Sequence, residues 1–236
     1  MTNYNSKFKT SILIISIFYF LFSIFCVADA QASPQFLVSW RAQNYAPSWY
    51  PGKILPANKT PIEISFELID NGKLADLSKT KVRWYINDNL IKNENDGLGI
   101  KKIKFNIPDY AGNETEVRII VVDYLGGEQI DKIIAIPTVS PETVIEAPYL
   151  NGEIGVGTSN FRALPFFFNI TNLNNLSVEW SANEQKSEGF FDNPWLLNLN
   201  IDSKTPLGTE IRLSALVKNP SKELEFASKN INLVIK

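Results

Sequence analysis

The sequence contains no histidine, and its single cysteine, Cys26, lies near the N-terminus. Without histidine the chain cannot build Ser-His-Asp or Cys-His nucleophilic groups, and one cysteine cannot form an internal disulfide. The same shortage removes the His and Cys ligand sets that hold zinc, iron or copper. Carboxylate chemistry stays open, either as glycoside hydrolysis by paired acids or as calcium binding through oxygen ligands.

The sequence also has no excess charge of one sign. It carries 23 Lys and Arg against 25 Asp and Glu, a net charge of −2, and the two signs are interspersed along the chain. Nucleic-acid-binding proteins usually show a basic patch, and none is visible in the order of the residues. The composition therefore predicts no nucleic-acid partner.

The apolar run that stands out lies at the N-terminus, from Ile12 to Val27. Two lysines precede it and small residues follow at 28–30, which is the layout of an export signal spanning residues 1–30. Cleavage predicts a mature N-terminus at Gln31 or Ser33. The alternative is an uncleaved anchor, because about 16 apolar residues fall just below the roughly 17 needed to span a bilayer. Both interpretations place the protein outside the cytoplasm, secreted or at the cell surface, with membrane contact only through 12–27 if uncleaved.

Short segments with alternating apolar residues follow, and turn-forming residues separate them. In the first half these segments are 62–66, 82–84, 103–107, 117–122 and 130–136, and in the second half 165–170, 178–180, 197–201, 211–217 and 230–235. Strands of this length and spacing predict antiparallel sandwiches.

The two halves share short sequence motifs as well as the spacing between these motifs. Val82-Arg83-Trp84 resembles Val178-Glu179-Trp180, and a Gly-bearing turn before a long strand follows each tryptophan at a similar distance. Residues 137–142 between the halves contain two prolines, as a short stiff connector would. The sequence therefore predicts two tandem domains, at 36–137 and 142–236.

Each half resembles a bacterial immunoglobulin-like sandwich, closest to the PKD-type modules of surface proteins. The resemblance depends on Trp84, Gly112 and the 117–123 strand in the first half, and on Trp180, Gly208 and the 211–219 strand in the second. It implies that both tryptophans fill the core between two packed sheets. The chain departs from the pattern in two ways, because it has no cysteine pair between the sheets and no Gly-Asp-Gly turn after the tryptophan.

Two aromatic clusters are candidate ligand contacts: Tyr45, Trp49 and Tyr50 in the first domain, and Phe190 and Phe191 in the second. Exposed aromatic rings bind sugars by stacking on their apolar faces. The alternative for the first cluster is that Trp40 faces the core while 45–52 covers one end of the sandwich. For the second cluster, the alternative is that Trp195 packs into the sandwich.

Acidic turns raise the question of calcium. Residues 93–97 fail the EF-hand pattern, because Lys92 and Ile103 stand where carboxylates belong. A looser calcium site remains an alternative to ordinary solvated turns, with the candidate carboxylates Asp70, Asp88, Asp96 and Asp123. No other cofactor or metal is expected.

Three function classes follow from these observations. We expect an exported, non-enzymatic structural or adhesive protein of the cell envelope, with an envelope protein or glycan as partner. The alternative is a glycan- or protein-binding module that uses the aromatic loops of the first domain. A carboxylate hydrolase is the third class, but no segment marks two facing carboxylates, and no catalytic residue is predicted.

Overall fold

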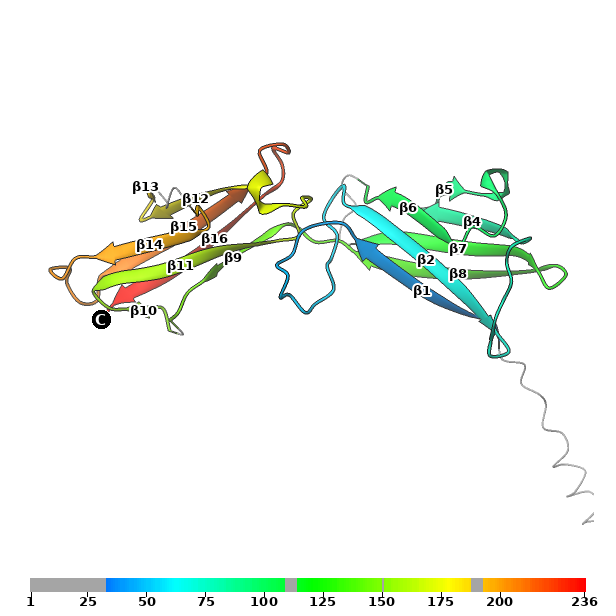
Figure 1. The fold of residues 1–236 in the computed structure, drawn as a ribbon, viewed down its shortest axis with the longest axis horizontal. Coiled ribbons are helices and arrows are strands. Elements are labelled where there is room, and N and C mark those ends of the chain that lie inside the picture. Colours follow the sequence, from blue (N-terminus) through cyan, green and yellow to red (C-terminus); the bar gives the residue numbers. More distant parts are fainter. Residues whose placement is uncertain (1–32, 109–113, 150, 188–192) are drawn as a thin grey trace, which may run out of the picture. The chain divides into compact units, whose positions relative to one another are not determined.

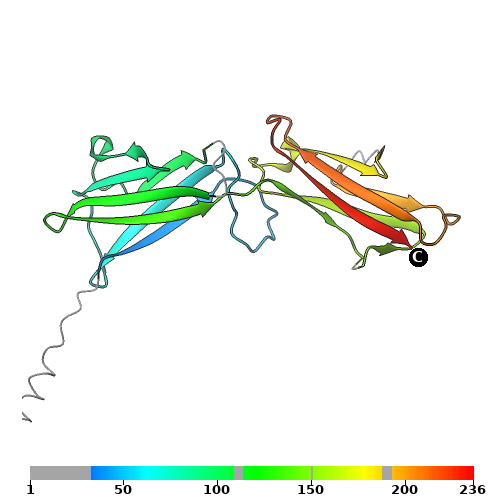
Figure 2. The same cartoon turned by 180° about the vertical axis from the view of Figure 1, so that it is seen from behind.

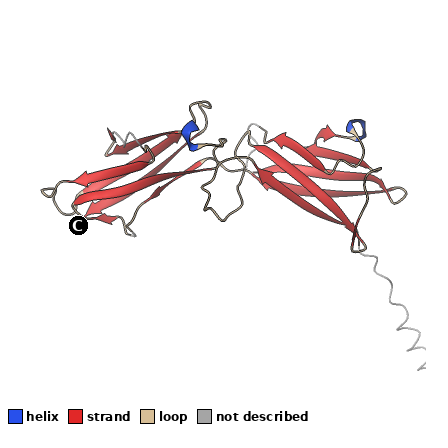
Figure 3. Cartoon of the chain, in the orientation of Figure 1, coloured by secondary structure: helices blue, strands red, loops and turns tan. Residues whose placement is uncertain are grey.

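The computed structural model describes residues 33–108, 114–149, 151–187 and 193–236. The predicted export signal at 1–30, Gly112, Phe190 and Phe191 lie outside these residues. Figure 3 shows the described chain as strands and loops, with helix limited to the short turns η1 (Glu94–Asp96) and η2 (Leu173–Asn175). Within the described ranges, no helix is long and apolar enough to cross a membrane.

The strands of the first half form two sheets (Figure 1). One has the order β1-β2-β3 with β6 also pairing with β2, and the other has the order β5-β4-β7-β8. The pairs whose register is described are antiparallel. The bounds are β1 (Gln35–Ala42), β2 (Pro61–Asp70), β3 (Lys73–Leu74), β4 (Lys81–Ile86), β5 (Asn89–Lys92), β6 (Lys102–Asn106), β7 (Glu114–Tyr124) and β8 (Glu128–Pro137).

A two-residue alternation in β2 builds the core of the first pair of sheets. Ile62, Ile64 and Phe66 are buried, and the residues between them are more exposed. Trp84 on β4 in the other sheet is also buried, and its ring centroid lies 5.6 Å from that of Phe66. Because the two rings come from different sheets, their contact joins the two inner faces into one core.

The strands of the second half also form two sheets, with the orders β14-β11-β9 and β10-β16-β15-β12-β13. Figure 2 shows β16, in red, beside β15. The bounds are β9 (Glu142–Glu146), β10 (Glu153–Ile154), β11 (Gly157–Phe166), β12 (Ser177–Ala182), β13 (Gln185–Ser187), β14 (Leu196–Ile201), β15 (Glu210–Lys218) and β16 (Phe226–Ile235).

Both sheets of the second half contribute to one apolar cluster. Trp180 on β12 is buried and belongs to the same cluster as Phe161 from β11, Leu197 from β14 and Leu213 from β15. Its indole Nε1 donates to the carbonyl of Pro194 at 3.0 Å. Trp84 Nε1 likewise donates to the carbonyl of Ile100 at 2.8 Å, so each tryptophan combines a large buried ring with a hydrogen bond for its N–H group.

The two halves have the same strand order. β9, β11 and β14 correspond to β1, β2 and β6, while β13-β12-β15-β16 corresponds to β5-β4-β7-β8. In the immunoglobulin-like arrangement, the first, second and fifth main strands form one sheet. The third, sixth and seventh form the other sheet. The predicted all-β tandem of immunoglobulin-like sandwiches is therefore confirmed at this level for the described residues.

Two details differ from the sequence prediction. A strand was expected at 165–170, but β11 ends at Phe166, where Phe167 takes a left-handed backbone conformation with φ of 63° and turns the chain out of the extended conformation. In addition, β10 pairs with β16 in parallel, with Glu153 opposite Val234. A strand of two residues is too short to show an alternation of apolar and polar residues in the sequence.

A matching hairpin follows each core tryptophan by three residues. Asn87 and Asn183 both take a left-handed conformation. The side-chain Oδ1 of each asparagine accepts from a backbone N–H on the long strand 29 residues later, Glu116 in the first half and Arg212 in the second. Asparagine suits this place because it tolerates positive φ and its side chain can bond to the backbone.

Contacts along the chain define two compact units. The larger one consists of Leu37–Glu67 and Asp76–Lys236. Leu68–Ala75 belongs to the smaller one, in which Ile69 pairs with Leu74 across the β2–β3 hairpin. Asp70 lies in the smaller unit, whereas the other candidate site residues among those that the structure describes lie in the larger one.

Candidate ligand-binding site

The connection between β1 and β2 carries the aromatic segment that the sequence singled out. Within it, the N–H group of Tyr45 donates to the carbonyl of Phe168, and the N–H group of Phe167 donates back to the carbonyl of Tyr45, each at 2.7 Å. These reciprocal bonds fix the backbone of the segment at Tyr45. Both partners belong to the larger compact unit.

Asn44 anchors the same segment from inside. Its side chain is buried, and its Nδ2 donates to the carbonyls of Leu55 at 2.7 Å and Phe167 at 3.1 Å. The carbonyls of Leu55 and Phe167 lie outside helices and strands, so these side-chain bonds give them hydrogen-bond partners. Among the described contacts, the Oδ1 of Asn44 has no hydrogen-bond partner.

Aromatic rings fill the space beneath the segment. The Tyr50 ring meets Phe166 edge to face at a centroid distance of 5.6 Å and Phe167 at 6.1 Å, and the Trp49 ring meets Phe166 at 6.1 Å. A Cβ added at Gly52 would lie 2.5 Å from the Tyr50 ring, so any larger residue there displaces that ring. The loop is thus held by ring packing as well as by backbone hydrogen bonds.

An open groove of about 270 Å³ lies beside the segment. Trp49 lines the groove, and 59 % of its surface is exposed. Its side chain is therefore accessible to a ligand. Binding pockets typically combine such apolar walls with a few polar groups. The lining residues are Tyr45, Pro47, Ser48, Trp49, Arg162, Ala163, Leu164, Pro165, Leu173, Asn193 and Trp195.

Charge in this groove is sparse. Arg162 is the ionised side chain among the lining residues, and its Nη1 lies 3.6 Å from Glu146 Oε2, with both side chains more than half exposed. Burial raises the pKa of the Tyr45 hydroxyl above its usual value, so this group stays a neutral hydrogen-bonding group at physiological pH. The groove therefore favours a ligand that is largely uncharged.

The structure separates the predicted site residues. Tyr45 and Trp49 line the groove, whereas Tyr50 packs against Phe166 and Phe167 instead. Trp195, expected to pack inward, lines the groove and also packs against both apolar clusters of the second half. Phe190 and Phe191 lie outside the described residues.

Trp40 on β1 is half-buried, and the ammonium nitrogen of Lys53 lies 3.4 Å from its ring centroid. Such an arrangement is a cation–π contact. Burial lowers the pKa of the Lys53 ammonium group below its usual value. The polar end of Lys53 thus covers one face of Trp40, which removes that face from ligand contact.

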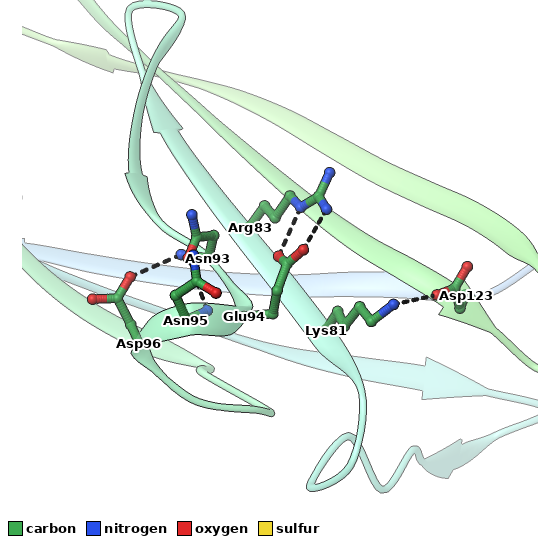
Figure 4. Close-up of polar contacts among 7 residues, drawn as sticks. All are labelled: Lys81, Arg83, Asn93, Glu94, Asn95, Asp96 and Asp123. Atoms are coloured by element: carbon green, nitrogen blue, oxygen red, sulfur yellow. Dashed lines mark hydrogen bonds and ion pairs between the residues drawn. The ribbon is translucent and has the colours of Figure 1, made fainter.

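Three of the four candidate calcium ligands accept hydrogen bonds or ion pairs from protein donors, and Figure 4 shows two of them, Asp96 and Asp123. Asp96 accepts from Lys92 Nζ at 2.8 Å. It also accepts from the backbone N–H of Asn93 at 3.0 Å, and Asp123 pairs with Lys81 at 3.1 Å. Asp70 accepts from the side chain of Asn71, and Asp88 lies in the β4–β5 turn. Across the described ranges, no three His, Cys, Asp or Glu side chains are grouped closely enough to hold a metal ion.

Arg83 and Glu94 form a two-point ion pair in the same region. Arg83 Nε donates to Glu94 Oε2 at 2.9 Å, and Nη2 donates to Oε1 at 2.5 Å. The hydrogen bonds from Arg83 are the main cause that lowers the pKa of Glu94 from 4.5 to about 2. Glu94 therefore stays charged in the folded protein at pH values where it would be protonated in the unfolded chain.

This pair predicts a specific acid sensitivity. A lowered folded-state pKa contributes stability above pH 4.5, and that contribution is lost as the pH falls from about 4.5 to about 2. Tm measured at closely spaced pH values should show Glu94→Gln below the wild type at neutral pH and converging with it toward pH 2. Arg83→Gln should show the same convergence. A Tm difference that stays constant across this range would contradict the assignment.

The comparisons with known proteins concern the fold. No protein-family model matches the sequence, and no curated protein is significantly similar. Among solved structures, the chain is similar to the three N-terminal domains of the bacteriophage RB49 highly immunogenic outer capsid protein Hoc, with 12 % identity and a TM-score of 0.44, covering 85 % of this chain and 59 % of that one.

Two further solved structures share the tandem immunoglobulin-like, all-β character. The D1–D4 ectodomain fragment of ICAM-5 matches at 9 % identity and a TM-score of 0.31, covering 85 % of this chain and 53 % of that one. The Bacteroides ovatus mixed-linkage glucan utilization protein SGBP-B, in complex with a heptasaccharide, matches at 13 % identity and a TM-score of 0.23, covering 84 % and 47 %. The chain thus spans less than two thirds of each of these chains, and similarity this low carries no information about ligands.

Proposed function

We propose that this chain is an exported, non-enzymatic adhesive protein of the cell envelope, and that it holds a glycan in the groove beside Trp49. The observation that carries the proposal is a large aromatic side chain, 59 % exposed, on a backbone fixed by Asn44 and Tyr45. A preorganised loop loses little conformational freedom when it binds, so more of the contact energy appears as affinity.

The chemistry of the groove suits a sugar ring. Sugars present an apolar C–H face that stacks on an indole and a rim of hydroxyl groups that need hydrogen-bond partners. Trp49 offers the first, and Ser48, Arg162 and Asn193 offer the second. A volume of about 270 Å³ lies just below the roughly 300 Å³ where pockets for drug-sized ligands begin. A groove of this size accommodates one ring of a longer chain at a time.

The groove supports binding without hydrolysis. Its lining residues include neither Asp nor Glu, and most glycoside hydrolases need two carboxyl groups on either side of the bond that they cleave. The absence of histidine from the whole sequence leaves few other catalytic groups. Holding a glycan at the cell surface is the role that these residues support.

The location and subfamily belong to the same proposal. Residues 1–30 have the layout of an export signal, and an adhesive role requires a place outside the cytoplasm. The tryptophan on the third main strand of each sandwich supports a PKD-type assignment, although Asn87 and Asn183 form the turn that follows instead of a Gly-Asp-Gly turn. We place domain boundaries at 36–137 and 142–236, which correspond to the two sets of sheets.

Trp49→Ala tests the proposal. Binding of the purified chain without residues 1–30 should be measured against insoluble peptidoglycan and a panel of soluble neutral glycans, by pull-down and calorimetry. Loss of the central aromatic contact of a small groove should weaken binding about tenfold or more. Trp49→Phe should retain part of the affinity, because a smaller ring still stacks.

Leu207→Ala is the matched control, because Leu207 is also strongly exposed but does not line the groove. It should bind like the wild type. Saturable binding that Trp49→Ala leaves unchanged would place the glycan elsewhere. If no glycan in the panel binds, the chain is better described as a structural spacer made of two sandwiches.

A further inference from the structure

A cluster of positive charge lies on the outer face of the β1-β2-β6 sheet. Glu63 on β2 contacts three basic side chains: Arg41 on β1 at 2.9 Å, and Lys102 and Lys104 on β6 at 2.8 and 3.4 Å. Glu63 alternates along β2 with the buried residues Ile62 and Ile64, so it points away from the core. The name basic triad is used below for Arg41, Lys102 and Lys104.

Exposure differs sharply between the acid and the bases. The Glu63 side chain is only 11 % exposed, whereas the side chains of the basic triad are 56 to 69 % exposed. The three cations therefore cover the carboxylate and present themselves to solvent. Hydrogen bonding to Lys102 is the main cause that lowers the pKa of Glu63. Glu63 therefore stays charged and paired with the three cations at physiological pH.

The triad keeps most of its binding capacity. An arginine has five N–H donors and a lysine has three, and the contacts with Glu63 use only a part of them. One negative charge against three positive charges leaves a local net charge of about +2. Lys101, which directly precedes β6, differs because it pairs with one carboxylate, Glu67, at 2.6 Å.

From this arrangement we propose that the basic triad binds an acidic polysaccharide, one that carries carboxylate or sulfate groups along its chain. Charge complementarity selects an anion, and Glu63 holds the cations in place before the ligand arrives. This site is separate from the groove beside Trp49 and does not depend on the function proposed for that groove.

The ligand should be a polymer. The triad lies on an exposed sheet face, where a single ion pair contributes only about 0 to 1 kcal/mol. Lys102 and Lys104 stand two residues apart on one strand, a separation of about 7 Å along the strand. A chain with repeated negative charges engages several cations at once, and each further contact is made at high effective concentration.

The surroundings favour a glycan over a protein partner. Ser39 and Asn106 extend the same face with a hydroxyl group and an amide that match sugar hydroxyl groups. Protein interfaces are depleted in lysine and depend on buried apolar or aromatic anchors. The centre of this face is two lysines and an arginine, and its exposed apolar side chain, Leu37, lies toward the start of β1 and not between the cations.

The experiment compares charged and neutral forms of one polymer. Binding of the chain without residues 1–30 should be measured by calorimetry against polygalacturonate, its carboxyl-reduced neutral form, heparin and poly-L-glutamate, each at several NaCl concentrations. We expect polygalacturonate or heparin to bind and the neutral form not to bind. Affinity should fall as salt rises, because screening weakens exposed charges. Polygalacturonate carries carboxylates alone and heparin carries sulfates in addition, so a comparison of the two shows whether sulfate groups add affinity.

The variant Arg41→Gln/Lys102→Gln/Lys104→Gln should weaken polyanion binding about tenfold or more and flatten its salt dependence. The matched control is Lys81→Gln/Lys186→Gln/Lys236→Gln, which removes the same net charge from lysines paired with carboxylates elsewhere. It should bind like the wild type, as should Trp49→Ala. Circular dichroism verifies that each variant is folded.

Three results would overturn the inference. Equal losses in the triad variant and the control would mean that only overall charge matters. Binding of the carboxyl-reduced polymer as tightly as polygalacturonate would mean that charge is not recognised. Preference for poly-L-glutamate over both polysaccharides would point to an acidic protein partner. Absence of neutral-glycan binding in the groove assay leaves this inference standing, so the two proposals fail independently.

Discussion

Trp84→Ala is expected to destabilise the first sandwich more than any other single change considered. Trp84 is completely buried, and its ring packs against Phe66 across the two sheets. Truncating a buried tryptophan costs about 3 to 5 kcal/mol, because it removes apolar contacts and leaves a cavity. The change also leaves the carbonyl of Ile100 without the Nε1–H group that donates to it at 2.8 Å.

Urea unfolding followed by far-UV circular dichroism measures this effect. For a domain of this size, a loss of 3 kcal/mol corresponds to a Tm lower by roughly 12 to 24 °C. Trp84→Phe should cost less, since it keeps a ring but loses the hydrogen bond. Leu207→Ala is the control, because Leu207 is 75 % exposed and such a side chain usually changes stability by less than about 0.5 kcal/mol. Equal effects of Trp84→Ala and Leu207→Ala would refute the assignment of Trp84 to the core.

Glu225→Ala should cause the second large loss. Glu225 is only 7 % exposed, and its carboxylate accepts from the backbone N–H of Asn169 and from Asn219 Nδ2, both at 2.5 Å. Removing the carboxylate leaves two donors in a largely buried place without partners. Each such donor costs about 1 to 3 kcal/mol, so the variant should lose roughly 2 to 6 kcal/mol.

Glu223→Ala is the matched control, because Glu223 lies in the same β15–β16 loop and is exposed. It should unfold like the wild type in urea. Glu225→Gln should fall between the two, since an amide retains one acceptor oxygen but presents an NH₂ group to one of the donors. A wild-type midpoint for Glu225→Ala would show that solvent replaces the carboxylate without cost.

The repeated strands could be predicted because their evidence is local. The alternation around Ile62 to Phe66 places one face inward whatever the rest of the chain does. The repeated hairpin was also present in the sequence, since an asparagine follows each of Trp84 and Trp180 by three residues. That spacing is the signal that sequence reasoning passed over.

The two candidate sites could not be predicted, because both are assembled from distant segments. Tyr45 bonds to Phe167 and Phe168, more than 120 residues away in the chain, and nothing near either segment indicates the partner. Arg41 meets Lys102 and Lys104 only because β1 and β6 flank β2. For the same reason the basic triad escaped a search for basic residues in sequence order.

The duplicated asparagine hairpin has a consequence for engineering. Each half carries its own tryptophan, its own asparagine turn and its own complete set of sheets. A gene that joins extra copies of 142–236 in series should therefore yield longer arrays in which every added copy supplies its own interior. Such arrays would be longer than the natural chain and would leave Trp49 and the basic triad unchanged.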